Sequence, residues 1–320
     1  MTATATRPES AATAPERPHR PLLALAAVMM VGAVACAVLL VVDPRDLGGQ
    51  PLWAKPLKFC VSISVYSLTL AWLIGLLPRR RRLARALGSI AVAGLAVEMV
   101  IIAGAAAAGE ASHFDVSTPL HTALWGAMAV SIVVVWFVTL VLAAMLARVR
   151  LRDASLTLGV RAGLVIGLVG MALAFLMTGP TASQISDYQG VVGAHAVGVS
   201  DGGPGLPLLG WSTTGGDLRI PHFLGMHALQ GLPLLAIALE RLSARVPLLR
   251  DAALRLRLGA VATAAWAAVV VTTCWQALRG QSIVAPDALT LTVGGVLSLL
   301  LAGAAVLAVT RATGRAEVQR

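Results

Sequence analysis

The stretch PLHTALWGAMAVSIVVVWFVTLVLAAMLA, residues 119–147, decides the fold class because it contains no Asp, Glu, Lys or Arg. An α-helix rises 1.5 Å per residue, so about 20 apolar residues cross the bilayer core. This stretch is longer, and we expect it to tilt or to project from the bilayer. Seven further segments are long enough to span. The eight predicted spans are residues 21–42, 57–77, 86–108, 119–147, 156–178, 221–240, 257–278 and 286–310.

The composition of the whole chain agrees with this class. Of its 320 residues, 58% are hydrophobic and 12% are charged, and the mean hydropathy is +0.83. A soluble domain is about half apolar and about a quarter charged. The sequence therefore predicts an all-α, polytopic transmembrane bundle of about eight helices, in contact with a lipid bilayer.

The basic residues predict how the bundle is oriented. The net charge of +10 could indicate nucleic-acid binding, but the arginines cluster between the apolar runs. With the N-terminus placed inside, 20 of the 25 Lys and Arg residues fall on the cytoplasmic side. The positive-inside rule then predicts that both termini are cytoplasmic, and it explains the charge without a nucleic-acid partner.

The ends of the chain are polar. Residues 1–20 are rich in Thr, Ala, Pro and Arg and are predicted to form a disordered cytoplasmic tail. Residues 21–310 form the predicted bundle, and residues 311–320 form a second cytoplasmic tail. Among the basic residues 23 are Arg and two are Lys, a bias typical of GC-rich bacterial genomes. The expected location is therefore the plasma membrane of a bacterium.

One connection, residues 179–220, is long, and the predicted topology places it outside the cell. It has nine glycines between residues 190 and 216, which excludes a helix there. It also carries His195, Asp201, Trp211 and several Val and Leu residues, unlike a flexible Gly/Ser linker. Such a loop is either an ordered cover over the outer end of the bundle or a flexible connection, and we favour the cover.

The stretch RIPHFLGMHALQGLP, residues 219–233, places polar groups inside a predicted span. On a helix, Met226, Gln230 and His227 lie at about 40°, 80° and 140° from His222. They share one arc, and Leu and Ala residues fill the other side. That arc is expected to face protein or a water-filled cavity, because polar groups in contact with lipid are costly.

Two other spans carry ionisable groups. Lys58 begins a stripe with Ser62, Tyr66 and Thr69, and it is either a functional cation or an interface anchor. Glu98 lies roughly 15 Å from the outer end of its span. An intramembrane acid is a functional candidate by default, and the alternative is a neutral Glu that hydrogen-bonds a neighbouring helix. Glu98 and Lys58 are the candidate catalytic or proton-moving residues.

Five of the six histidines fall at or near the outer face, which suggests a cofactor site. Neutral imidazoles bind haem iron, copper and zinc, and helical bundles hold cofactors between facing helices. We therefore expect haem b or a Cu or Zn ion; each histidine could instead cap a helix or hydrogen-bond locally. The candidate haem ligands are His113, His121, His222 and His227, and the candidate metal ligands are His121, His222 and His227.

Four stretches carry a resemblance: WAKPLKF, SHFDVSTPLH, GMALAFLMTGPT and DGGPGLPLLGWSTTGGDLRIPHFLGMHALQ. They resemble a family of multi-pass membrane proteins of high-GC bacteria over roughly residues 50–280. The resemblance implies a membrane location and supports the choice of spans, and it implies no activity. Eight helices with outer histidines are also similar in outline to haem A synthase, a similarity of architecture alone.

These features leave four functions open. The first is a redox protein with haem or a transition metal at the outer histidines, working with a redox partner or a small-molecule substrate. The second is a proton-coupled transporter centred on Glu98. The third is a membrane hydrolase with zinc near the outer surface. The fourth is a structural or assembly protein whose histidines only stabilise helices.

Overall fold

The computed structural model describes residues 18–318, so residues 1–17 of the tail predicted at residues 1–20 lie outside this range. Eight helices of the described chain are long and apolar enough to cross a membrane, which confirms the predicted all-α transmembrane bundle. They are α1 Arg20–Val42, α2 Ala54–Gly75, α3 Arg81–Ala108, α4 Pro119–Leu146, α5 Ala154–Ala172, α7 Arg219–Leu242, α8 Ala252–Leu278 and α9 Ala288–Val318.

The helices extend beyond the predicted spans mainly where polar residues form their first turns. α3 begins at Arg81, five residues before the predicted start. The prediction followed apolar residues and therefore missed the arginines in the first turn of this helix. α1 begins at Arg20, and His19 caps it by accepting a hydrogen bond from the Leu22 amide. His19 is buried, although the sequence placed it in the disordered tail. Polar first turns are invisible to a search for apolar segments.

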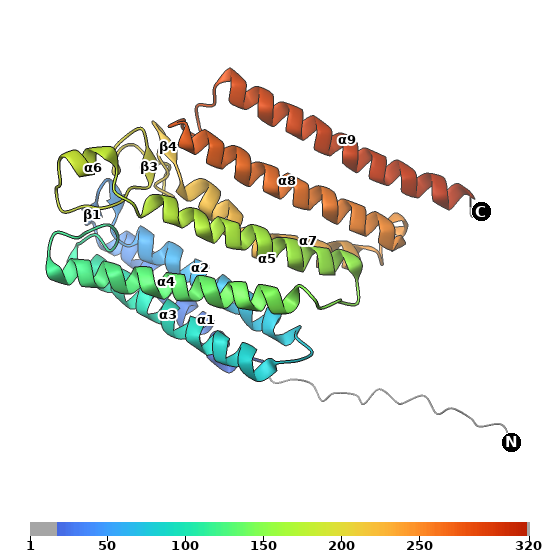
Figure 1. Ribbon diagram of the computed structural model, residues 1–320, viewed down its shortest axis with the longest axis horizontal. Coiled ribbons are helices and arrows are strands. Elements are labelled where there is room, and N and C mark those ends of the chain that lie inside the picture. The colour runs from blue at the N-terminus through green and yellow to red at the C-terminus, as the bar shows by residue number, and fades with distance from the viewer. Residues whose placement is uncertain (1–17, 319–320) are drawn as a thin grey trace.

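Successive helices run in opposite directions, so the connections gather at two ends of the bundle (Figure 1). We call one the cap end; it carries residues 43–53, 109–118, 178–218 and 279–287. The opposite end carries residues 76–80, 147–153 and 243–251, and we call it the arginine end. Figure 1 shows the small elements at the cap end. They are the pairs β1 Asp46–Leu47 with β2 Gln50–Pro51 and β3 Ala196–Val197 with β4 Gly216–Asp217, and the short helix α6 Ala182–Ser186.

The bundle has two parts. Helices α1–α4 pack together around buried side chains such as Leu70, Leu73 and Leu142. Helices α5, α7 and α8 form a second group, and α9 lies at its edge against α8 (Figure 1). α5 continues towards the cap end as the 3-10 helix η1 Leu173–Met177, while the 3-10 turn η2 Pro247–Arg250 precedes α8 at the arginine end.

Glycines allow α5 and α7 to approach very closely. A Cβ atom on Gly163 would lie 2.7 Å from the carbonyl oxygen of Ala228, and one on Gly170 would lie 2.3 Å from the carbonyl carbon of Gly225. No real side chain fits at such distances. In a membrane, where lipid is as apolar as Leu, backbone packing of this kind is a main source of helix association. This contact fixes the position of the first turns of α7.

We expect the substitution Gly170→Ala to lower the free energy of unfolding by about 2 kcal/mol, because the added methyl group overlaps the α7 backbone. Gly126 in α4 has no heavy atom within 4 Å of the corresponding position, so Gly126→Ala is the matched control and should keep wild-type stability. SDS titration of the purified protein in mixed micelles measures the unfolding midpoint of each variant. Equal unfolding midpoints for the two variants would contradict the close approach of α5 and α7.

Candidate functional site

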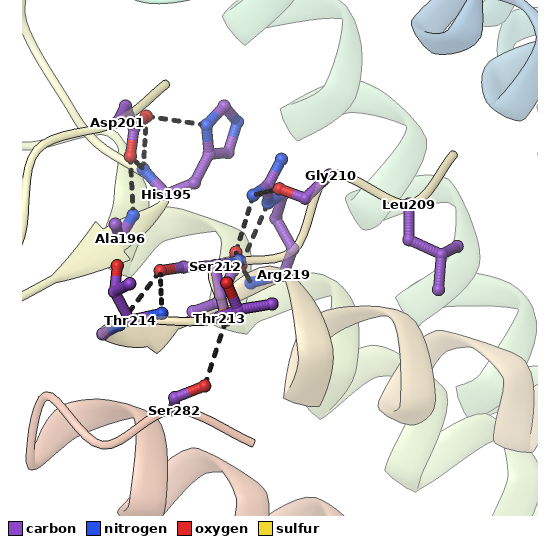
Figure 2. Close-up of polar contacts among 12 residues, drawn as sticks. His195, Ala196, Asp201, Leu209, Gly210, Ser212, Thr213, Thr214, Arg219 and Ser282 are labelled. Carbon is purple, nitrogen blue, oxygen red and sulfur yellow. Dashed lines mark hydrogen bonds and ion pairs between the residues drawn. The ribbon is translucent and has the colours of Figure 1, made fainter. Parts of the chain in front are cut away.

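Two carboxylates, the buried Asp217 and the more exposed Asp201, organise the long loop at the cap end, residues 178–218, which we call the cap loop. Asp217 accepts hydrogen bonds from the Ser212 amide at 2.8 Å and from the Arg219 amide and guanidinium at 3.0 and 2.9 Å. Arg219 in turn donates to the carbonyl of Gly210 at 2.5 Å (Figure 2). The Asp217 side chain is fully buried. One ion pair therefore ties the start of α7 to two points of the cap loop.

Asp201 orders the other half of the cap loop. Its carboxylate accepts from the amides of His195 and Ala196 and from the His195 ring nitrogen Nδ1 at 2.8 Å (Figure 2). Burial raises the pKa of Asp201, but these hydrogen bonds outweigh it and hold the pKa at about 2. Burial lowers the pKa of His195 despite the neighbouring carboxylate. His195 is therefore neutral, with Nδ1–H donating to Asp201 and Nε2 left as an acceptor.

Beneath the cap loop, three ionisable groups from different elements meet. The ammonium Nζ of Lys55, in the first turn of α2, lies 3.1 Å from Nδ1 of His113 in the α3–α4 connection. The other ring nitrogen, Nε2, lies 3.6 Å from Oε1 of Glu98 in α3. The second distance is too long for a hydrogen bond. We call these three residues the Lys–His–Glu relay.

The relay is shielded from water. Glu98 is 2% exposed, and its second oxygen Oε2 has no hydrogen-bond partner among the described residues. The rings of Phe59 and Trp125 stand 5.8 and 5.2 Å from the imidazole of His113. Burial, and then the charge of Lys55, lowers the pKa of His113 well below its ordinary value. The neutral imidazole accepts from Lys55 at Nδ1 and points its Nε2–H at Glu98.

The structure joins two candidates that the sequence indicated separately, Glu98 and His113, and adds Lys55, which was not among the predicted site residues. Lys58 lies elsewhere: its ammonium donates to the carbonyl of Leu209 at 2.8 Å and so holds the tip of the cap loop. A signal for Lys55 was present, because it is three residues from Lys58 and lies within about 60° of it on the helix. Tyr66 bonds Thr139 at 2.6 Å in the core of α2 and α4.

The remaining histidines have separate surroundings. The ring of His121 lies between two carboxylates, with Nε2 at 3.2 Å from Glu110 and Nδ1 at 3.1 Å from Asp115. His222 donates from Nδ1 to the Gly170 carbonyl at 2.7 Å. His227 is exposed and contacts Gln230 at 3.4 Å.

Nitrogens free to bind a metal are therefore few. Both ring nitrogens of His121 contact carboxylates, and those of His113 face Lys55 and Glu98. Nε2 of His195, His222 and His227 makes no hydrogen bond within the described chain. Within residues 18–318 there is no group of three or more His, Cys, Asp or Glu residues placed to hold a metal ion. Ligation by His113, His121, His222 and His227 stays a prediction.

We expect Asp217→Asn to loosen the cap loop, because the variant leaves Arg219 without its counter-charge. Breaking a buried ion pair costs several kcal/mol, so cleavage of residues 198–216 by an added protease should accelerate about tenfold or more. The control is Asp287→Asn, which breaks the half-exposed pair with Arg279 at the same end of the bundle. Equal cleavage rates in the two variants would show that the Asp217–Arg219 pair does not hold the loop.

Comparisons with protein-family models, with curated proteins and with solved structures found no match to this chain. The resemblance seen in the sequence therefore remains a prediction.

Proposed function

We propose that this chain is a proton-coupled transporter of a bacterial plasma membrane, in which Glu98 takes up and releases the proton. The cap end faces the outside of the cell in this proposal, because the arginine end carries the basic clusters expected at the cytoplasmic side. The observation that carries the proposal is the buried contact of Lys55, His113 and Glu98.

The cost of burying these groups supports a functional role. A single charged residue at the centre of a bilayer costs about 3 kcal/mol or more, and such residues commonly mark proton or ion pathways. With Lys55 charged and Glu98 ionised, the relay is neutral overall and each charge has a partner through the imidazole. A neutral hydrogen bond to a neighbouring helix would satisfy Glu98 more simply, but its oxygen Oε2 has no such partner in the described residues.

The order of the groups suggests a direction for proton movement. The side chain of His113 is 16% exposed and that of Glu98 is 3% exposed, so the imidazole lies between the cap end and the acid. An imidazole can receive a proton at Nδ1 and release one from Nε2. Protons from the outer solution would thus reach Glu98 through His113. The present gap of 3.6 Å would have to shorten during transfer.

We expect Glu98→Gln to abolish proton entry into proteoliposomes after an external acid pulse, measured with a trapped pH-sensitive dye. Glu98→Asp should keep part of the rate, because it retains an acid and a counter-charge for Lys55. The control is Glu240→Gln, which removes a carboxylate that is paired with Arg152 at the arginine end and does not contact the relay. Wild-type proton entry in a correctly folded Glu98→Gln protein would refute the proposal.

A second candidate is the redox protein with haem b or a copper ion, and a specific observation favours it. His195 and His222 both donate Nδ1–H to a protein acceptor, the arrangement that orients imidazoles for metal binding through Nε2. His222 lies in the first turn of α7 and His195 in the cap loop, both at the cap end. Met226 follows on the same arc of α7 and could add sulfur to a copper site. His195, His222 and Met226 would hold the haem or the copper ion, and the bound group would supply electron transfer.

If this second candidate is correct, protein purified after expression with haem or copper supplied should hold a stoichiometric amount of one of them. An absorption spectrum detects haem, and elemental analysis detects copper and, for the hydrolase alternative, zinc. The variants His195→Ala and His222→Ala should each lose the bound group, while His121→Ala should retain it. Protein free of haem and metal would rule out this candidate and the zinc hydrolase.

A further inference from the structure

A cavity of about 240 Å³ opens between α3 and α4 at the cap end, beside the Lys–His–Glu relay. Its apolar lining includes Ile101, Gly104 and Leu124, together with Val100, which is 72% exposed. Its rim is polar and contains Glu110, Asp115 and His121. An apolar interior with a few polar groups at one side is typical of a small-molecule site.

The charge of the rim selects among ligands. Two carboxylates face one imidazole, so acidic groups outnumber basic groups at the rim. His121 contacts one oxygen of each acid, and Oε1 of Glu110 makes no hydrogen bond within the described chain. A ligand that complements this cavity has a cationic head with hydrogen-bond donors and a short apolar body. An anionic headgroup such as a phosphate would be repelled.

The cavity also touches the relay. Ser112 lines the cavity, and its hydroxyl lies 3.1 Å from Nδ1 of His113, the atom that contacts Lys55. A cation bound beyond Ser112 would therefore lie close to the ammonium of Lys55 and would disfavour a further positive charge on the relay. Cation binding and proton binding would then oppose each other, as an exchange of one cation for one proton requires.

We propose that this cavity binds a small lipophilic ammonium ion, and that such amines are the substrate class exchanged for the proton on Glu98. The exchange rests on the proposed function, whereas the binding of the amine does not. The apolar walls take up the alkyl chain, and the ammonium group donates to Glu110 and Asp115 at the membrane surface.

Matched ligands of equal chain length test the binding. Calorimetric titration of the full chain in zwitterionic nanodiscs, with empty nanodiscs as the blank, compares hexylammonium, hexanol and hexanoate. We expect hexylammonium to bind more tightly than hexanol, and hexanoate not to bind. Glu110→Gln should weaken hexylammonium by about fivefold and leave hexanol unchanged. Glu240→Gln, an acid paired with Arg152 at the arginine end, is the control and should change neither.

A second variant fills the cavity without disturbing helix packing. Gly104 has no heavy atom within 4 Å of an added Cβ, so Gly104→Leu should fold normally and weaken both hexylammonium and hexanol. Binding of hexylammonium no stronger than to empty nanodiscs, or unchanged by both Glu110→Gln and Gly104→Leu, would overturn the proposal.

Proton release separates this inference from the proposed function. In weakly buffered solution, hexylammonium should release up to one proton per chain from the wild type and none from Glu98→Gln, while both proteins bind the amine. Binding without proton release in the wild type would support the cavity as an amine site and contradict the proton-coupled function. Proton movement through Glu98 without amine binding would support the proton-coupled function and contradict the cavity as an amine site.

Discussion

The cost of an unpaired charge in hydrocarbon governs the cap end of this protein. Lys55 and Glu98 lie where water is scarce, and each reaches a ring nitrogen of His113. Asp217 is fully buried and is compensated by Arg219 and by two backbone amides. Because a lone charge at these positions would destabilise the bundle, the first turns of α2 and α7 and the middle of α3 cannot shift independently.

The close approach of α5 and α7 complements these ion pairs. Gly170 packs against Gly225, and its carbonyl also accepts the hydrogen bond from His222. The same backbone contact therefore sets the helix spacing and the orientation of an imidazole. The cap loop then closes over this region through Arg219 and through the contact of Lys58 with Leu209. Helix packing below and loop closure above thus enclose the ionisable groups between them.

The sequence predicted the number and class of the helices because long apolar runs have few alternatives in a protein of this composition. The helix ends were harder to predict, since the polar first turns at His19 and Arg81 carry no hydropathy signal. Glu98 and His113 could each be identified as candidate site residues, because burying an acid deep in a span or a histidine at its edge costs free energy. Their meeting with Lys55 could not be derived, since helical angles place residues within one helix and say nothing about the rotation of its neighbour.

The same reason explains why the partners of the histidines could not be predicted from the sequence. Placing five of them at one end of the bundle suggested a shared site, and yet His121 pairs with Glu110 and Asp115 while His222 bonds the backbone of α5. His195 and Asp201 lie in a glycine-rich loop, and their short contact depends on turns that periodicity does not describe. Local sequence therefore identified which groups lie at the cap end, and only the packing of the helices and loop decided their partners.

The most direct test of proton exchange at Glu98 is infrared difference spectroscopy of the carboxyl groups as the external pH is changed. We expect a protonated-carboxyl band in the wild type that shifts in heavy water, is missing in Glu98→Gln and remains in Glu110→Gln. In His113→Gln the same band should respond to external pH far more slowly. A wild-type spectrum without such a band, or one that Glu98→Gln leaves unchanged, would contradict the claim that Glu98 exchanges a proton with the solution at the cap end.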